Sequence, residues 1–127
     1  MKKPFRFTIG CVIGTRPELI KMAPVFFQLQ KCSWANAILI NTAQHREMLD
    51  TMLNVFNLKT HYDLNVMKTN QSLGDLTGNL CNTLDALVKA HHFDILLAAG
   101  DTTTVFVSSL IAFYNQRGYL LAILKQA

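Results

Sequence analysis

The chain has 127 residues, 50% of them hydrophobic and 16% charged, which is enough apolar material for one domain with a buried core. This composition excludes a disordered or fibrous class. The formal net charge is +4, but the lysines and arginines are scattered rather than gathered in a basic block, so no nucleic-acid partner is expected. No apolar run is long enough to cross a bilayer, so no membrane partner is expected either.

The three cysteines, Cys11, Cys32 and Cys81, are odd in number and far apart. Their spacing matches neither a disulfide framework nor a zinc site, so we expect reduced, mostly buried thiols in a cytoplasmic protein and no bound metal. The charged start of the chain, residues 1–7, resembles that of a signal peptide. The apolar run that follows lacks a small-residue cleavage site, and a strand explains it better.

Strands and helices are predicted to alternate along the chain. In chain order we expect a strand over 5–13, a helix over 16–31, a strand over 35–42, a helix over 45–56, a short strand over 62–66, a helix over 72–90, a strand over 94–99, a helix over 103–115 and an apolar stretch over 119–124 that would add a fifth strand. These units predict an α/β fold, a doubly wound, Rossmann-like parallel sheet with helices on both faces. Pro24 predicts a kink or loosening of its helix, and Gly74 and Gly78 predict close packing of theirs.

In such a sheet, ligands bind beyond the carboxyl ends of the strands, and three polar clusters of this chain follow strand ends. The first is Gly14-Thr15-Arg16-Pro17-Glu18, with Lys21 further along the expected helix. Glycine permits a tight turn, a helix N-terminus attracts anions, and Arg16 and Lys21 add positive charge, so the cluster suits a phosphate. The alternative is an ordinary capped helix in which Lys21 pairs with Glu18. The GxGxxG and Walker patterns are absent, which disfavours a nicotinamide cofactor or ATP.

The second and third clusters follow the second and fourth predicted strands. The second, residues 42–47, contains Gln44 and His45, which could reach a sugar or nucleotide but could equally belong to a helix-capping cluster. The third, residues 100–104, contains Asp101, which could act as a general base or bind a sugar hydroxyl. The alternative for Asp101 is the N-cap of the next helix, a position that Asp often occupies.

Taken together, four segments resemble the non-hydrolysing UDP-N-acetylglucosamine 2-epimerases: residues 14–24 (GTRPELIKMAP), 42–50 (TAQHREMLD), 62–67 (YDLNVM) and 100–104 (GDTTT). The resemblance runs from about Phe5 to Asn115, in order and at the family's spacing. It also accounts for Pro24, because the family carries a proline there. The fold that it implies is the GT-B architecture, in which two Rossmann-like domains enclose the active site between them.

The resemblance also implies a reaction and roles for single residues. The family interconverts UDP-N-acetylglucosamine and UDP-N-acetylmannosamine by elimination and re-addition of UDP, without a metal or redox cofactor. By this analogy the ligand is UDP-N-acetylglucosamine or UDP, bound in part by the turn that contains Gly14 and Thr15. Arg16 and Lys21 would hold charge near the diphosphate or sugar. Asp101 would serve proton transfer at C2 or bind the sugar.

A second ligand site exists in some members of the family. Gln44 and His45 match positions that contact a second, activating UDP-N-acetylglucosamine in those members. They also carry an arginine in the loop after the third strand, where this chain has Lys68-Thr69-Asn70-Gln71. The missing arginine argues against allosteric activation of this chain.

The chain departs from the family after Asn115. The family continues into a Glu-Ala-Gly-Leu-Arg segment with a catalytic glutamate, whereas this chain reads QRGYLLAILKQA over 116–127. We therefore expect residues 1–127 to form an incomplete N-terminal Rossmann-like domain, the truncated N-terminal half of a GT-B architecture, with the second, nucleotide-binding domain absent. Elimination and re-addition need both an acid and a base, so such a fragment would be inactive alone.

Two other interpretations remain open at this point. The chain could be a non-catalytic UDP-sugar-binding or interaction module that retains the fold, or, less favoured by the clusters, half of a glycosyltransferase of the same architecture. Apolar surface left exposed where another domain would pack predicts a homo-oligomer or pairing with a missing C-terminal half.

Overall fold

The computed structural model describes residues 6–116 in full and residues 118–122 as backbone. These residues form a five-stranded sheet of order β3-β2-β1-β4-β5, in which every neighbouring pair is parallel. Its elements are β1 (Phe7–Ile13), α1 (Arg16–Lys31), β2 (Ala35–Asn41), α2 (Arg46–Val55), β3 (Tyr62–Asp63), α3 (Leu73–Ala90), β4 (Ile95–Ala99), α4 (Thr103–Tyr114) and β5 (Gly118–Ala122). The predicted doubly wound, Rossmann-like α/β fold is confirmed.

Strand β1 lies at the centre of the sheet because its sequence is apolar on both sides. It pairs with β2 along its whole length and with β4 on its other edge. Cys11, in the middle of β1, is fully buried and stands opposite Leu39 on one side and Leu97 on the other. A parallel strand that is covered on both faces needs a continuous apolar run, which is the pattern that predicted it.

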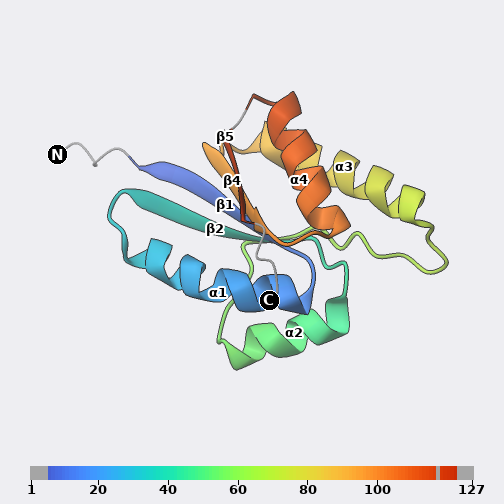
Figure 1. Ribbon diagram of the computed structural model, residues 1–127, viewed down its shortest axis with the longest axis horizontal. Helices are drawn as coiled ribbons and strands as arrows, with labels where there is room; N and C mark the ends of the chain where they lie inside the picture. The colour runs from blue at the N-terminus through green and yellow to red at the C-terminus, as the bar shows by residue number, and fades with distance from the viewer. Residues whose placement is uncertain (1–5, 117, 123–127) are drawn as a thin grey trace.

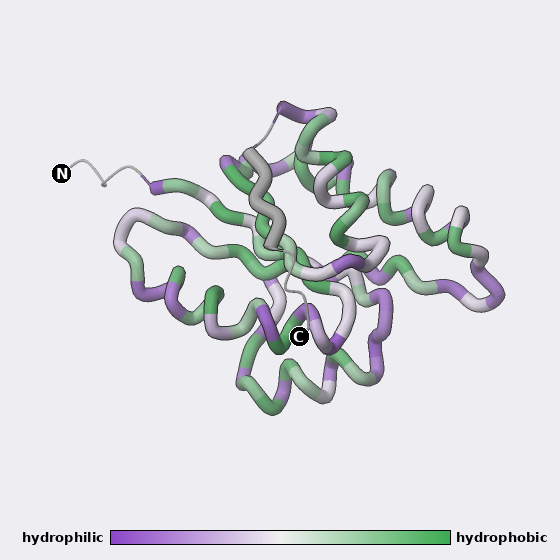
Figure 2. The backbone as a smooth tube through the Cα atoms, viewed as in Figure 1, coloured by the Kyte–Doolittle hydropathy of each residue, from purple (hydrophilic) through white to green (hydrophobic). Residues whose placement is uncertain are grey.

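Helices α1 and α2 cover one face of the sheet, and α3 and α4 cover the other (Figure 1). Each face has its own core, and successive β1 side chains enter opposite cores: Cys11 packs with Leu19 and Phe26 of α1, whereas Val12 packs with Leu80 of α3. Figure 2 shows that the hydrophobic residues concentrate in the strands at the centre of the molecule. The polar loops at the strand ends are therefore held by a rigid, two-sided core.

The third strand is shorter than predicted. Strand β3 contains only Tyr62 and Asp63, because Asn65 adopts a left-handed conformation with a φ of 47° that a strand does not accommodate. Helix α1 continues through the exposed Pro24 without interruption. Residues 123 and 124 of the predicted fifth strand lie outside the described residues, as do residues 1–5.

The predicted close packing at the glycines of α3 is wrong. A Cβ added at Gly78 would meet no atom within 4 Å, and one added at Gly74 would meet only the Ser72 hydroxyl, at 3.7 Å. Both glycines lie on the exposed side of the helix.

The described residues carry no helix that is long and apolar enough to span a membrane. All three cysteines are free; Cys11 is buried, and Cys32 and Cys81 are partly exposed. No group of three or more potential metal ligands occurs within the described part of the chain.

Candidate functional site

The three polar clusters lie side by side at the edge formed by the carboxyl ends of the strands. We name them the phosphate turn (Gly14–Glu18), the Gln44 turn (Thr42–His45) and the Asp101 loop (Gly100–Thr104). The Gln44 turn is tied to the phosphate turn because His45 donates its backbone N–H to the Gly14 carbonyl at 3.0 Å. The Asp101 loop is tied to the same turn through Thr102, whose hydroxyl donates to Glu18 at 2.5 Å.

Gly14 is required in the phosphate turn because two hydroxyl groups lie against its Cα. A Cβ at this position would overlap Thr42 Oγ1 and would lie 2.5 Å from Thr104 Oγ1. These two buried hydroxyls are hydrogen-bonded to each other at 3.1 Å. Glycine therefore lets the ends of β1 and β2 and the start of α4 approach more closely than any other residue would.

Glu18 is buried where the phosphate turn meets the Asp101 loop. Its Oε1 accepts the N–H groups of Gly14 at 2.9 Å and Thr15 at 2.8 Å, and its Oε2 accepts the Thr102 hydroxyl. Burial raises the pKa of Glu18, whereas these hydrogen bonds favour the charged form and act in the opposite direction. Because these donors occupy the carboxylate, the predicted alternative of a Glu18–Lys21 pair is wrong.

The Gln44 turn is shaped by a left-handed residue. Ala43 has a φ of 59° and donates its N–H to Asn41 Oδ1 at 2.7 Å, which holds the turn in place. Gln44 Oε1 then accepts the hydroxyl of Thr104 at 2.9 Å. His45 occupies the N-cap position of α2, but its exposed side chain makes no capping hydrogen bond. The side chains of Gln44 and His45 are therefore not used for helix capping.

A cavity of about 280 Å³ opens at the N-terminus of α1. Its lining residues are Thr15, Arg16, Pro17, His45, Met48 and Thr102. Thr15 is the N-cap residue of α1, as predicted, and forms a capping box with Glu18. The positive end of the α1 dipole and the guanidinium of Arg16 make this cavity favourable for an anion.

Lys21 and Asp101 do not line this cavity. Lys21 lies half-buried further along α1, and Asp101 is exposed in the loop after β4. The N-cap residue of α4 is Thr102, so the alternative role of Asp101 as the N-cap is wrong. Among the described residues, Arg16, Lys21 and Asp101 form no ion pair, which leaves their charges available to a ligand.

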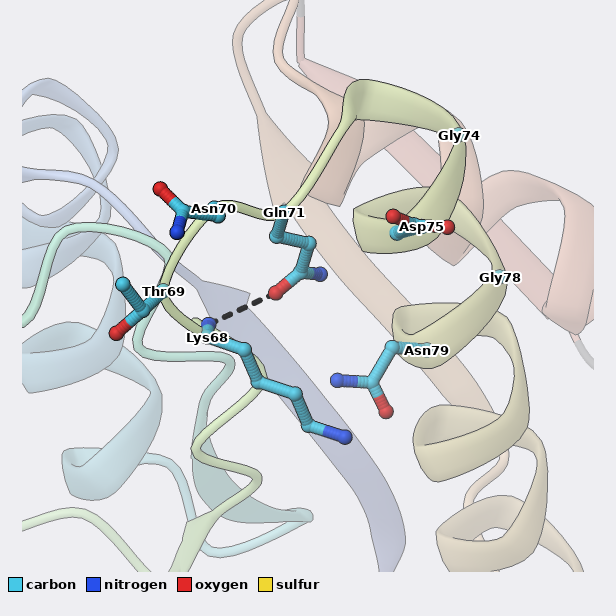
Figure 3. A pocket seen from close by; sticks show the side chains of 8 residues that line it. All are labelled: Lys68, Thr69, Asn70, Gln71, Gly74, Asp75, Gly78 and Asn79. Carbon is cyan, nitrogen blue, oxygen red and sulfur yellow. Dashed lines mark hydrogen bonds between the residues drawn. The ribbon is translucent and has the colours of Figure 1, made fainter.

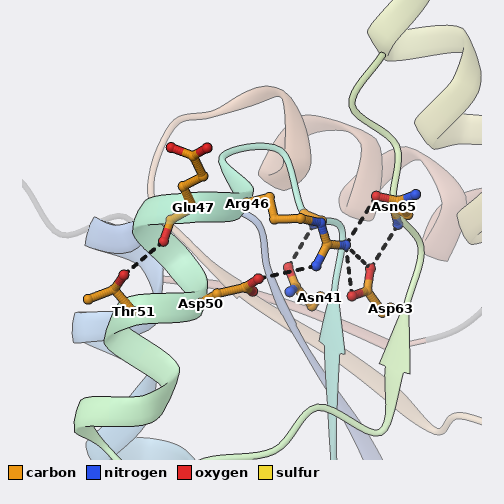
Figure 4. Close-up of polar contacts among 8 residues, drawn as sticks. Asn41, Arg46, Glu47, Asp50, Thr51, Asp63 and Asn65 are labelled. Carbon is orange, nitrogen blue, oxygen red and sulfur yellow. Dashed lines mark hydrogen bonds and ion pairs between the residues drawn. The ribbon is translucent and has the colours of Figure 1, made fainter. Parts of the chain in front are cut away.

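Arg46, at the start of α2, fixes the loop after β3. Its Nη2 donates to the two carboxylate oxygens of Asp63 at 2.7 and 2.8 Å and to Asn65 Oδ1 at 3.1 Å, while Nη1 pairs with Asp50 at 3.4 Å (Figure 4). One nitrogen thus serves both oxygens of Asp63, and this charge-assisted contact holds the end of β3 against the start of α2. Sequence reasoning missed it because Asp63 lies 17 residues further along the chain.

A second cavity, of about 450 Å³, lies between the loop after β3 and the start of α3. Figure 3 shows its lining residues, Lys68, Thr69, Asn70, Gln71, Gly74, Asp75, Gly78 and Asn79. Ser72 and Asp75 cap the helix reciprocally, and Gln71 Oε1 accepts the N–H of Lys68 at 2.8 Å. Its lining includes the acidic Asp75, whereas the cavity at α1 is lined by Arg16 and by no acidic residue, so the cavity at α1 is the better candidate for an anionic ligand.

The roles of Glu18, Thr102 and Thr104 at this edge were missed by sequence reasoning. An acidic residue in the first helical turn and threonines at a helix start are also common capping residues, so they carry little signal on their own. The one available signal was the run of three threonines after Asp101, which exceeds what a single N-cap needs.

Residues 28–117 match the family model described as UDP-N-acetylglucosamine 2-epimerase. The UDP-N-acetylglucosamine 2-epimerase of Neisseria meningitidis is 50% identical over 105 residues, which are 83% of this chain and 28% of that protein. The enzyme of the same name from Bacillus subtilis is 50% identical over 111 residues, 87% of this chain and 29% of that protein. The chain thus spans less than a third of the length of these curated relatives.

Solved structures share the fold over most of this chain. The Neisseria meningitidis UDP-GlcNAc 2-epimerase bound to UDP-GlcNAc matches with a TM-score of 0.83 and 46% identity, covering 91% of this chain and 32% of that one. The Methanocaldococcus jannaschii enzyme in complex with UDP-GlcNAc and UDP matches with a TM-score of 0.85 and 26% identity, with 91% and 32% covered. Because the family model covers more than half of its length, the chain belongs to the UDP-N-acetylglucosamine 2-epimerase family.

Proposed function

We propose that the chain binds UDP-N-acetylglucosamine or UDP at the carboxyl edge of its sheet. The observation that carries this proposal is the cavity at the N-terminus of α1, which Thr15, Arg16 and His45 line together. A diphosphate is the part of the ligand that the positive end of a helix dipole and a guanidinium favour. Support for this ligand class comes from two solved relatives, one bound to UDP-GlcNAc and one to UDP-GlcNAc and UDP.

The reaction that we propose for this site is the interconversion of UDP-N-acetylglucosamine and UDP-N-acetylmannosamine. A base removes the proton from C2 while the C1–O bond to UDP breaks; re-addition of UDP and delivery of a proton to the opposite face of C2 give the epimer. Asp101 is proposed for proton transfer at C2 or for a sugar hydroxyl, because it is exposed and unpaired. Arg16 and Lys21 would stabilise the diphosphate as it gains charge on leaving. Gln44 and His45 are proposed as ligand contacts from the second cluster.

We infer that this chain alone binds the nucleotide sugar without converting it. Elimination and re-addition require an acid and a base with opposite roles. Glu18, which is connected to the Asp101 loop through Thr102, is occupied by backbone and hydroxyl donors. Asp101 would then have to serve both roles, which a single carboxylate does poorly.

Calorimetric titration of UDP and UDP-N-acetylglucosamine into the purified chain tests binding. Substitution of Arg16 by Met is expected to weaken affinity about tenfold or more, because a charge-assisted contact to phosphate is lost. The matched control is Lys31→Met, which removes a cation from the last turn of the same helix and should leave the affinity unchanged. Absence of heat at millimolar ligand would reject the binding proposal and favour an interaction module.

Turnover is tested separately by NMR, which distinguishes the gluco and manno epimers during incubation with UDP-N-acetylglucosamine. We expect no manno epimer from this chain alone. Its appearance would reject the inference of inactivity and would identify acid–base groups beyond Asp101.

We also propose that the chain self-associates through α4. This helix contains no charged residue, and Phe106, Phe113 and Tyr114 on it are 60%, 76% and 65% exposed. Exposed aromatic side chains on one uncharged helix favour burial against another surface. Light scattering should show a mass above that of one chain, and substitution of Phe106 and Phe113 by Lys should return it to that of one chain. An unchanged mass would reject this interface.

A cytoplasmic location and a role in cell-envelope polysaccharide synthesis complete the proposal. Support for the location comes from the three cysteines, none of which forms a disulfide in the described part of the chain, as expected in a reducing compartment. Cell fractionation with thiol labelling tests the location, and a disulfide-linked, exported chain would contradict it.

A further inference from the structure

Thr102 stands at the N-cap of α4 but does not cap its own helix. An N-cap threonine ordinarily accepts the N–H of the second or third helical residue. Here the side chain makes no capping bond, and its hydroxyl instead donates to Glu18 Oε2, 84 residues back in the chain. A hydrogen bond from a hydroxyl to a carboxylate is stronger than a neutral one, so this contact fixes the loop to the phosphate turn.

Thr104 makes the corresponding contact on the other side of the loop. Its fully buried hydroxyl donates to Gln44 Oε1 at 2.9 Å, across 60 residues of sequence. A threonine hydroxyl has one proton, so the 3.1 Å contact between Thr42 and Thr104 is donated by Thr42. The result is a directed chain of hydrogen bonds from Thr42 through Thr104 to Gln44.

Thr103, between these two residues, makes no such contact. It is partly exposed, and its side chain makes no hydrogen bond within the part of the chain that the structure describes. Gly100, at the other end of the loop, has a φ of 116°, which lets the chain leave β4 toward Glu18. Asp101 lies between Gly100 and the first of the two threonine contacts, and its side chain is exposed.

We propose that Thr102 and Thr104 are positioning residues, which hold the Asp101 loop between the phosphate turn and the Gln44 turn. This inference rests on the proposed function, because it assigns to the two hydroxyls the placement of Asp101 relative to Arg16 and to Gln44. It also accounts for the alternate threonines in the sequence Asp101-Thr102-Thr103-Thr104: the first and third are needed as donors, and the middle one is not.

The direction of the hydrogen bonds fixes what Gln44 offers to a ligand. Because Gln44 Oε1 accepts from Thr104, the amide oxygen is directed inward and the NH2 group remains available to an acceptor. Phosphate oxygens and carbonyl groups are acceptors of this kind. Loss of the Thr104 hydroxyl would release the amide to rotate and would remove this selectivity.

The first experiment needs no ligand. Backbone 15N order parameters are measured in Thr102→Val, Thr104→Val and the matched control Thr103→Val, each of which replaces one hydroxyl by a methyl group. In Thr102→Val the values at Asp101 and its neighbours should fall from about 0.85 toward 0.6, whereas Thr103→Val should keep the wild-type values. In Thr104→Val the side-chain NH2 resonances of Gln44 should shift. Thr102→Ser and Thr104→Ser, which retain the hydroxyl, should restore both signals.

The second experiment measures the affinity for UDP-N-acetylglucosamine in the same variants. We expect about a tenfold loss in Thr102→Val and Thr104→Val, no loss in Thr103→Val, and recovery in the serine variants. If the wild-type chain does not bind this ligand, the proposed function fails while the order parameters still decide the positioning role. Equal order parameters and equal affinities in all three valine variants would overturn the inference. If Thr104→Val does not fold, the comparison of Thr102→Val with Thr102→Ser decides the inference, because Thr102 is less buried.

Discussion

Of the glycines outside the strands, Gly14 is the one at which substitution by Ala should lower the free energy of unfolding most. The new Cβ would overlap Thr42 Oγ1 and lie 2.5 Å from Thr104 Oγ1, closer than non-bonded atoms approach in folded proteins. This steric overlap is removed only if at least one of the two hydroxyl groups moves. Such a movement breaks the Thr42–Thr104 hydrogen bond and loosens the contact of Thr104 with Gln44.

The magnitude follows from two contributions. Overpacking by one methyl group in a tight site costs about 1–3 kcal/mol. A buried hydroxyl that loses its partner costs about 1–3 kcal/mol more, and both threonines are fully buried. The expected loss in the free energy of unfolding is therefore about 2–6 kcal/mol, a large part of the total stability of a domain of this size.

Urea denaturation of the purified chain measures this loss, with Gly78→Ala as the control. Gly78 lies inside α3 with open space where a Cβ would be, so alanine there should stabilise the helix by about 0.5–1 kcal/mol. A loss below about 1 kcal/mol for Gly14→Ala, or changes of equal sign in the two variants, would refute the account of the close approach at Gly14.

Three further predictions concern single side chains. Substitution of Pro24 by Ala should raise the free energy of unfolding by about 2 kcal/mol, because residue 24 then donates an N–H to the helix; an unchanged or lower urea midpoint would contradict this. Burial raises the pKa of Cys11 to about 12, so alkylation monitored by mass spectrometry should label Cys32 well before Cys11, and simultaneous labelling would oppose it. Burial also raises the pKa of Glu18, so the folded state holds this proton more tightly than the unfolded one. The free energy of unfolding of the wild type, measured relative to that of Glu18→Gln, should therefore rise as pH falls from above the raised pKa to below the unfolded value; a relative loss on acidification would contradict this.

The sheet and the position of its polar clusters could be predicted from the sequence because both depend on local patterns. Continuous apolar runs predict buried parallel strands, and the carboxyl ends of such strands meet at one edge whatever the loops contain. The bounds of β3 were less accessible. Its early end follows from the left-handed conformation of Asn65, whose side chain accepts from Arg46 of another element.

The contacts inside the site were not accessible because their partners are remote in sequence. From the local sequence, Glu18 is predicted as an acidic residue in the first turn of a helix and Thr102 as a helix cap. The sequence around each of them does not indicate that the two side chains are hydrogen-bonded to each other. The same holds for Asp101, whose alternative role as an N-cap is excluded only by the observed start of α4 at Thr103. Local chemistry identified the clusters, and tertiary structure alone identified the hydrogen bonds that join them.

Mapping of backbone amide chemical shifts during titration with UDP-N-acetylglucosamine tests the central claim most directly. We expect the largest shifts in the phosphate turn, the Gln44 turn and the Asp101 loop, and smaller shifts there in Arg16→Met at equal ligand concentration. No shift at millimolar ligand, or shifts confined to the second cavity around Lys68 and Asn79, would contradict it.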